Sequence, residues 1–149
     1  MVTWGDFAEA EPDMAKVLAD SLAWIPITYL ATVRKDGAPR LHPICPIIGK
    51  GRIFVAVPEW SAKRYDLKND RRYALHALPG KLDAEFYMTG RAKIIKDAPT
   101  RALVVKSAGH TVHTSDWLFE FGIEQVMTAY WEKQGQPDTY AVRKFWHAP

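Results

Sequence analysis

The chain has 149 residues, 48% of them hydrophobic, and a formal net charge of +3 at pH 7. A chain of this length usually forms one domain, and its apolar content can bury about two thirds of the surface that the unfolded chain exposes. Global disorder is therefore excluded, and so small a charge argues against a dedicated nucleic-acid binder. We expect a single domain over residues 1–149 and no nucleic-acid partner.

Cysteine content and charge placement predict the compartment. The single cysteine, Cys45, cannot form a disulfide within the chain, which suits a reducing cytosol. The first residues are acidic where a signal peptide needs bases. The longest uncharged run, Ser21 to Val33, contains Pro26 and is too short to span a bilayer. We expect a soluble, cytoplasmic protein with no membrane partner.

A helix is predicted near the N-terminus, over residues 12–24. Pro12 suits the first helical turn, where an N–H group has no partner to lose, and Asp13 lies near the positive end of the helix dipole. One face of this helix is apolar at intervals of three and four residues, through Met14, Val17, Leu18, Leu22 and Ile25.

After this helix the apolar residues alternate, which is the period of a strand. Strands are predicted over residues 27–34 and 39–48, joined at the hairpin dipeptide Asp36-Gly37. The segment Ile53 to Val57 is apolar on both faces, as in a buried central strand, and follows a tight turn at Gly49 to Gly51. We expect these three strands to form a meander.

The second half of the chain combines short helices with strands. Ser61 is predicted to cap a helix that runs through Asn69, and Asp97 a helix over residues 98–107. Further strands are expected at residues 72–78, 84–95, 119–123 and 140–147. Seven strands without regular βαβ alternation indicate an antiparallel barrel or sandwich rather than a parallel sheet.

The helix after Ser61 has the features of an anion site. A capping hydroxyl, free backbone N–H groups, the positive end of the helix dipole and the Lys63 ammonium together suit a phosphate group. Residues 63–72 add to this charge, with five cations against two acids. Taken alone, the segment has an alternative interpretation as a capped helix with solvated charges.

Four segments carry a resemblance that extends over roughly residues 13–147. They are Tyr29 to Pro43, Gly51 to Val57, Ser61 to Lys63 and Thr89 to Ala92. In this order and spacing they resemble the flavin-binding split-barrel family related to pyridoxamine 5'-phosphate oxidase. The resemblance implies a mainly β fold with a few short helices, an antiparallel split β-barrel with Greek-key connections. It also implies a homodimer with FMN sites at the interface between the protomers.

Five residues match the family's flavin-binding positions or adjoin them. By this resemblance, Arg40 and His42 lie beside the ribityl chain and the ring edge, while Ser61 and Lys63 hold the phosphate. Trp60 is expected to line the ring. We expect no catalytic protein residue, because the cofactor carries the electrons and the protein supplies orientation and electrostatics.

Arg91 is a sixth cofactor-binding candidate. With Arg34 and Arg64 it would extend a basic groove for the acidic tail of a deazaflavin, so deazaflavin and haem stay open as alternatives to FMN. The expected function is that of a small flavin-dependent oxidoreductase whose substrate is small and planar enough to stack on aromatic rings. The alternative is a module that binds or sequesters flavin, deazaflavin or haem without turnover.

Two residues that differ from the oxidase, and a histidine pair without a third ligand, limit the expected chemistry. Ala62 and Cys45 stand where the oxidase itself has further cations, so we expect one phosphate site and no oxidation of pyridoxamine phosphate. His110 and His113 lack a third ligand at metal-binding spacing, so no metal is expected.

Overall fold

The computed structural model describes residues 1–80 and 82–149 of the chain. Its helices are α1 (Trp4–Ala10), α2 (Pro12–Trp24), α3 (Lys63–Asn69) and α4 (Ala98–Ser107). Its strands are β1 (Thr28–Val33), β2 (Pro39–Ile44), β3 (Ile47–Gly49), β4 (Arg52–Val57), β5 (Arg72–Ala77), β6 (Glu85–Ile95), β7 (Trp117–Glu132) and β8 (Tyr140–His147).

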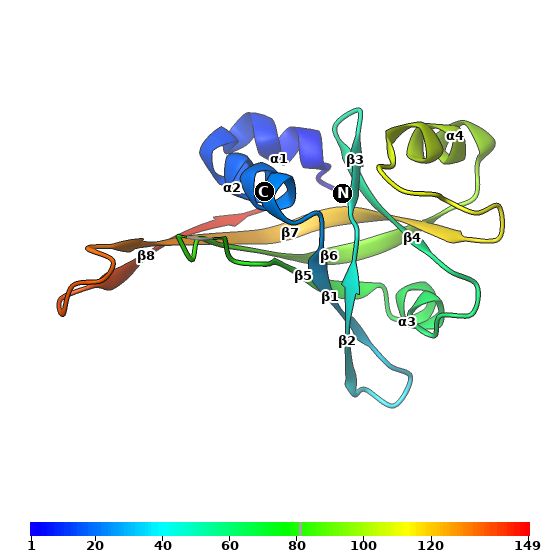
Figure 1. Ribbon diagram of the computed structural model, residues 1–149. Helices are drawn as coiled ribbons and strands as arrows, with labels where there is room; N and C mark the ends of the chain where they lie inside the picture. The colour runs from blue at the N-terminus through cyan, green and yellow to red at the C-terminus, as the bar shows by residue number, and fades with distance from the viewer. Residues whose placement is uncertain (81) are drawn as a thin grey trace.

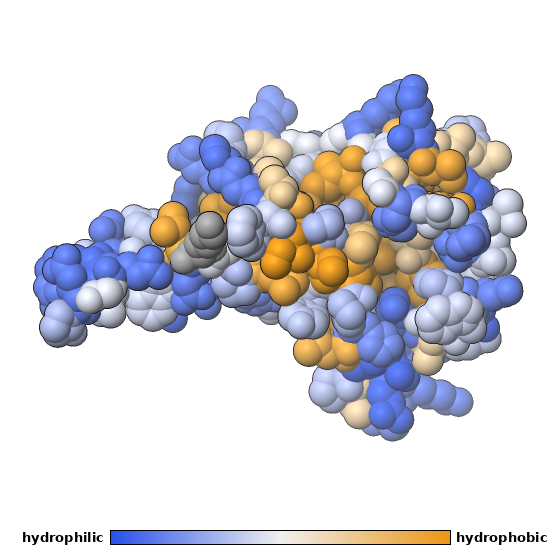
Figure 2. All heavy atoms as spheres, viewed as in Figure 1, coloured by the Kyte–Doolittle hydropathy of each residue, from blue (hydrophilic) through white to orange (hydrophobic). Residues whose placement is uncertain are grey.

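The strands form one antiparallel sheet in the order β2-β1-β5-β6-β7-β4-β3, with β8 paired to β7 outside this path. The sheet curves without closing, so the fold is a split barrel, as the sequence predicts. In Figure 1, α1 and α2 lie together above the sheet, α3 lies below it, and the β7–β8 ribbon projects away from the body. Figure 2 shows hydrophobic residues gathered over the middle of the viewed face, whereas the tip of this ribbon is hydrophilic.

The barrel core is built on one face of the sheet. Leu30, Leu75, Met88 and Val126 are register partners across β1, β5, β6 and β7, and all four are fully buried. Phe7 of α1 belongs to the same cluster. Neighbouring residues along each strand point to the opposite face, so the next row of residues forms the outer surface of the sheet.

Most predicted elements are confirmed within a residue or two at each end. The helix over residues 12–24 has the predicted bounds, and Pro12 lies in its first turn. The preceding helix, α1, has seven residues and is not predicted from the sequence. A capping box fixes its start: the Thr3 hydroxyl accepts from the Asp6 N–H, and the Asp6 carboxylate accepts from the Thr3 N–H.

The predicted strand 39–48 and the meander are wrong. The strand breaks at Cys45-Pro46, where proline cannot donate to the ladder, and its second part forms a hairpin with β4. That hairpin lies at the other end of the sheet order from β2, and β4 pairs with β7. The break therefore yields eight strands and leaves β4 between β3 and β7. β4 is apolar on both faces because Ile53, Val55 and Val57 belong to the main core cluster, whereas Phe54 belongs to a second cluster with Val104 of α4.

Candidate functional site

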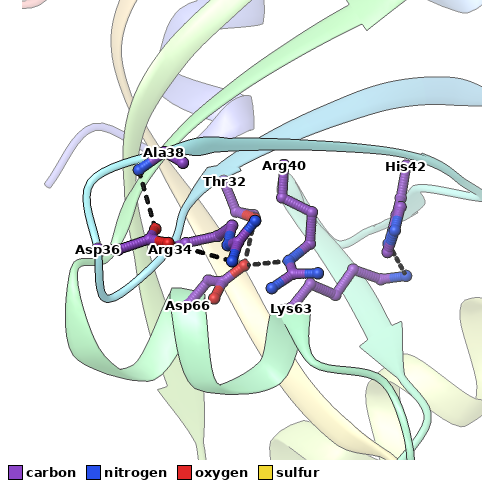
Figure 3. Close-up of polar contacts among 8 residues, drawn as sticks. All are labelled: Thr32, Arg34, Asp36, Ala38, Arg40, His42, Lys63 and Asp66. Atoms are coloured by element: carbon purple, nitrogen blue, oxygen red, sulfur yellow. Dashed lines mark hydrogen bonds and ion pairs between the residues drawn. The ribbon is translucent and has the colours of Figure 1, made fainter.

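The candidate site lies where β2 meets the beginning of α3. Arg40 and His42 are two residues apart on β2, so both side chains point to the same face of the sheet, and they pair in register with Thr32 and Leu30 of β1. Lys63 is the first residue of α3. Figure 3 shows the three cationic or basic side chains converging between the strand and the helix.

Asp66, one turn into α3, orients Arg40. Its carboxylate is buried and accepts hydrogen bonds from Arg40 Nε at 2.7 Å and from the Thr32 hydroxyl at 2.8 Å. Neither terminal nitrogen of the Arg40 guanidinium has a hydrogen-bond partner in the part of the chain that the structure describes. The Arg40 guanidinium is thus held through Nε, and its two terminal nitrogens can donate to an anion.

Lys63 and His42 are close enough for a long hydrogen bond. Lys63 Nζ lies 3.5 Å from His42 Nδ1, which accepts when the ring is neutral. Burial, and then the charge of Arg40, lower the pKa of Lys63. Burial, Lys63 and Arg40 lower the pKa of His42, against a smaller opposing effect of Asp66. The lowered pKa values of Lys63 and His42 indicate that the cluster of Arg40, His42 and Lys63 has too little negative charge nearby to balance its cations.

The absence of a carboxylate beside Lys63 is the most informative feature of this cluster. No ion pair of Lys63 is found among residues 1–80 and 82–149, and Asp66 is engaged by Arg40. A partly buried ammonium without a counter-ion is destabilised relative to water. A phosphate group in contact with Lys63 and Arg40 would supply that charge, so the residues present fit the phosphate end of a flavin nucleotide.

Ser61 does not occupy the N-cap position that the sequence predicts for it. Ala62 is the N-cap residue of α3, and no side chain caps the helix, so the capping prediction for Ser61 is wrong. Ser61 is buried in the preceding turn, where its N–H donates to the Pro58 carbonyl at 2.9 Å. Trp60 in the same turn is 84% exposed, and its role beside a flavin ring stays a prediction.

Arg91 lies apart from this cluster. It projects from β6 and forms an exposed ion pair with Glu124, 3.1 Å from Nε to Oε1. It lines a different hollow, of about 320 Å³, with Arg71 and Lys93. The structure therefore brings together Arg40, His42 and Lys63 but not Arg91 within the chain.

The sequence analysis did not identify Asp66 and Thr32 as parts of the site. Asp66 is separated by 26 residues from Arg40 and by 34 from Thr32, and each occurs in an ordinary helix or strand pattern. Their meeting depends on the packing of α3 against β1. No local signal in the sequence marks that contact.

Comparison with known proteins places the fold in one structural class. No family model and no curated protein matches the sequence, but many solved structures match the fold. A pyridoxamine 5'-phosphate oxidase-related, FMN-binding protein from Nostoc punctiforme has 13% identity and a TM-score of 0.63, covering 93% of this chain and 96% of that chain. General stress protein 26 from Bacillus anthracis has 16% identity and a TM-score of 0.60, covering 89% and 97%.

A heme-binding protein from Mycobacterium smegmatis is also similar, with 15% identity and a TM-score of 0.63. The alignment covers 87% of this chain, which spans 56% of that longer protein. The chain therefore has the split-barrel fold of the pyridoxamine 5'-phosphate oxidase-related proteins, the family that the sequence resembles. Proteins with this fold include ones described as FMN-binding and as heme-binding.

The described residues contain neither a membrane-spanning helix nor a metal-binding cluster. No helix among them is long and apolar enough to cross a membrane. Within the same residues, no group of three or more histidine, cysteine, aspartate or glutamate side chains is placed to hold a metal ion.

Proposed function

We propose that the protein binds FMN through the Lys63 cluster and acts as a homodimeric, flavin-dependent oxidoreductase in the cytoplasm. The observation that carries the proposal is the partly buried Lys63 ammonium, which faces Arg40 and His42 and has no described carboxylate partner. Charge-assisted hydrogen bonds to a phosphate would satisfy both cations at once. The FMN-binding relative with the same fold supports this choice of anion.

Each residue of the cluster then has a distinct role. Lys63 and the terminal nitrogens of Arg40 donate to phosphate oxygens, and Asp66 keeps the Arg40 guanidinium in the correct plane. His42 is neutral near pH 7 because its pKa is lowered, so it accepts a hydrogen bond from Lys63 rather than repelling it. The flavin would supply the hydride or electron transfer, and the protein would bind and orient it.

The outer face of the sheet supports the proposed dimer. Six residues, one from each of six adjacent strands, form a register row across it: Pro43, Tyr29, His76, Tyr87, Met127 and Phe145. Tyr29 and Phe145 are 43% and 56% exposed, and the neighbouring Leu41 of β2 is 62% exposed. Exposed aromatic and apolar side chains of this kind are enriched at interfaces between protein chains. Light scattering should give about twice the chain mass of 16.9 kDa, and a monomer would refute the dimer.

FMN titration of a Lys63 variant tests the phosphate site. Lys63→Met keeps the aliphatic stem and removes the charge, so the loss of one charge-assisted contact should weaken binding by about 10- to 150-fold. Lys106→Met is the matched control, because Lys106 is an exposed lysine near the end of α4. Equal affinities of the parent and both variants would contradict the proposed site.

Haem binding is a second candidate function, favoured by the geometry of His76. His76 Nδ1 lies 2.6 Å from the Ala77 carbonyl oxygen, which can only accept, so in the neutral tautomer that makes this bond Nδ1 carries the proton and Nε2 has a free lone pair. This is the arrangement of an imidazole that ligates iron. The ring lies between Tyr29 and Tyr87 in the outer register row. A Soret band that His76→Ala abolishes would support this candidate, and a flavin spectrum without one would exclude it.

A further inference from the structure

A groove extends from the Lys63 cluster along α3. It has a volume of about 540 Å³, and it is lined by the β1–β2 hairpin on one side and by α3 on the other. Its lining residues are Arg34, Lys35, Asp36, Arg40, Ala62, Tyr65 and Asp66. Figure 3 shows Arg40 in the middle of this arrangement, with His42 and the Lys63 ammonium on one side and Arg34 and Asp36 on the other. The groove therefore continues past the proposed phosphate position, away from His42.

The far end of the groove offers cations that an anion can recruit. Arg34 pairs with Asp36 at 3.1 Å, and about half of each side chain is exposed. A pair this exposed is worth roughly 0–1 kcal/mol, so a ligand phosphate can compete for Arg34 at little cost. Lys35 has no ion-pair partner within residues 1–80 and 82–149. The groove thus holds three cations and two carboxylates before any ligand binds.

Tyr65 provides an aromatic surface beside these cations. Its ring is held by the Arg64 guanidinium, 4.5 Å from the ring centroid, and by the edge of Trp117 at 6.0 Å. Arg64 also donates a hydrogen bond to the Tyr65 hydroxyl at 2.6 Å. Tyr65 nevertheless remains 49% exposed and lines the groove. A ring that is both fixed and exposed suits stacking by a planar base.

We propose that this groove binds the adenylyl half of a flavin dinucleotide, so that the protein accepts FAD as well as FMN. The second phosphate lies at Arg34 and Lys35, and the adenine stacks on Tyr65. This inference rests on the proposed function, since it starts from a first phosphate at Lys63. It concerns binding alone and requires no further chemical step.

Comparing FAD with FMN isolates the groove, because the two ligands differ only by the adenylyl half. In calorimetric titrations, Arg34→Gln/Lys35→Gln and Tyr65→Leu should each weaken FAD binding by about 10- to 100-fold. FMN affinity should change less than about twofold in both variants, because FMN ends at the phosphate bound by Lys63 and Arg40 and does not reach Arg34, Lys35 or Tyr65. Lys96→Gln/Lys106→Gln is the matched control for the removal of two exposed charges. Circular dichroism and the melting temperature establish that each variant is folded.

The outcomes separate this inference from the proposed function. If both groove variants leave FAD binding unchanged while Lys63→Met weakens FMN binding, the groove assignment is wrong and the proposed function stands. If Lys63→Met leaves binding of both flavins unchanged, the proposed function fails, and the groove assignment fails with it. ADP should compete with FAD in the parent. If inorganic tripolyphosphate competes with FAD as well as ADP does, the groove binds its ligand by charge alone. That result would overturn adenine stacking on Tyr65.

Discussion

The ion pair between Arg52 and Glu120 is predicted to be a main stabilising contact of the barrel. Arg52 on β4 donates to both carboxylate oxygens of Glu120 on β7, at 2.7 and 2.5 Å, and reaches the Thr100 hydroxyl of α4 at 3.4 Å. The carboxylate side chain is only 4% exposed, and the arginine side chain is 29% exposed. Glu120→Gln keeps the shape of the side chain and leaves a half-buried guanidinium without its counter-ion.

The expected cost follows from this burial. Breaking a fully buried pair costs roughly 3–5 kcal/mol, and the partial hydration open to Arg52 reduces this to about 2–3 kcal/mol. For a chain of this size, the melting temperature should fall by about 4–12 °C. Glu124→Gln is the control, since Glu124 lies on β7 like Glu120 and pairs with Arg91 of β6, but both of these side chains are more than half exposed. That variant should cost about 0–1 kcal/mol.

Urea denaturation of the parent and of both variants measures these differences. The double-mutant cycle of Glu120→Gln with Arg52→Gln isolates the pair itself from other effects of each substitution. Similar losses from Glu120→Gln and Glu124→Gln would refute the argument, because burial would then not determine the strength of an arginine–glutamate pair in this protein.

Two further predictions concern His42 and Gly90. Because the pKa of His42 is lowered in the folded state, protonation of His42 favours the unfolded chain, so stability should rise as pH increases through the folded pKa towards 6.5. The difference in unfolding free energy between the parent and His42→Gln, measured from pH 5 to pH 8, should change over that window and be flat above it. A Cβ atom at Gly90 would lie 1.9 Å from the Gly122 carbonyl oxygen, at the register shift between β6 and β7, so Gly90→Ala should cost about 2–3 kcal/mol. Gly109→Ala, which has open space around it, should leave the melting temperature nearly unchanged.

Part of the candidate site was accessible from the sequence. The residue types around Ser61 and Lys63 suggested an anion site, and the resemblance added Arg40 and His42 on the preceding hairpin. The structure brings Lys63, Arg40 and His42 together. It also shows that the expected cap at Ser61 is absent. Capping depends on the backbone angles of the turn, which residue types alone do not decide.

The elements themselves were determined largely by the sequence, because hydrophobic period and turn chemistry act over a few residues. The helix at residues 12–24 and the Asp36-Gly37 hairpin follow from such local patterns. Strand partners are different, since alternation sets which face of a strand is buried and not which strand lies beside it. Only the tertiary structure decided that the β3–β4 hairpin lies at the other end of the sheet from β2, that β4 pairs with β7, and that Asp66 orients Arg40. These contacts join residues far apart in the sequence, and their free energy comes from packing that no local segment contains.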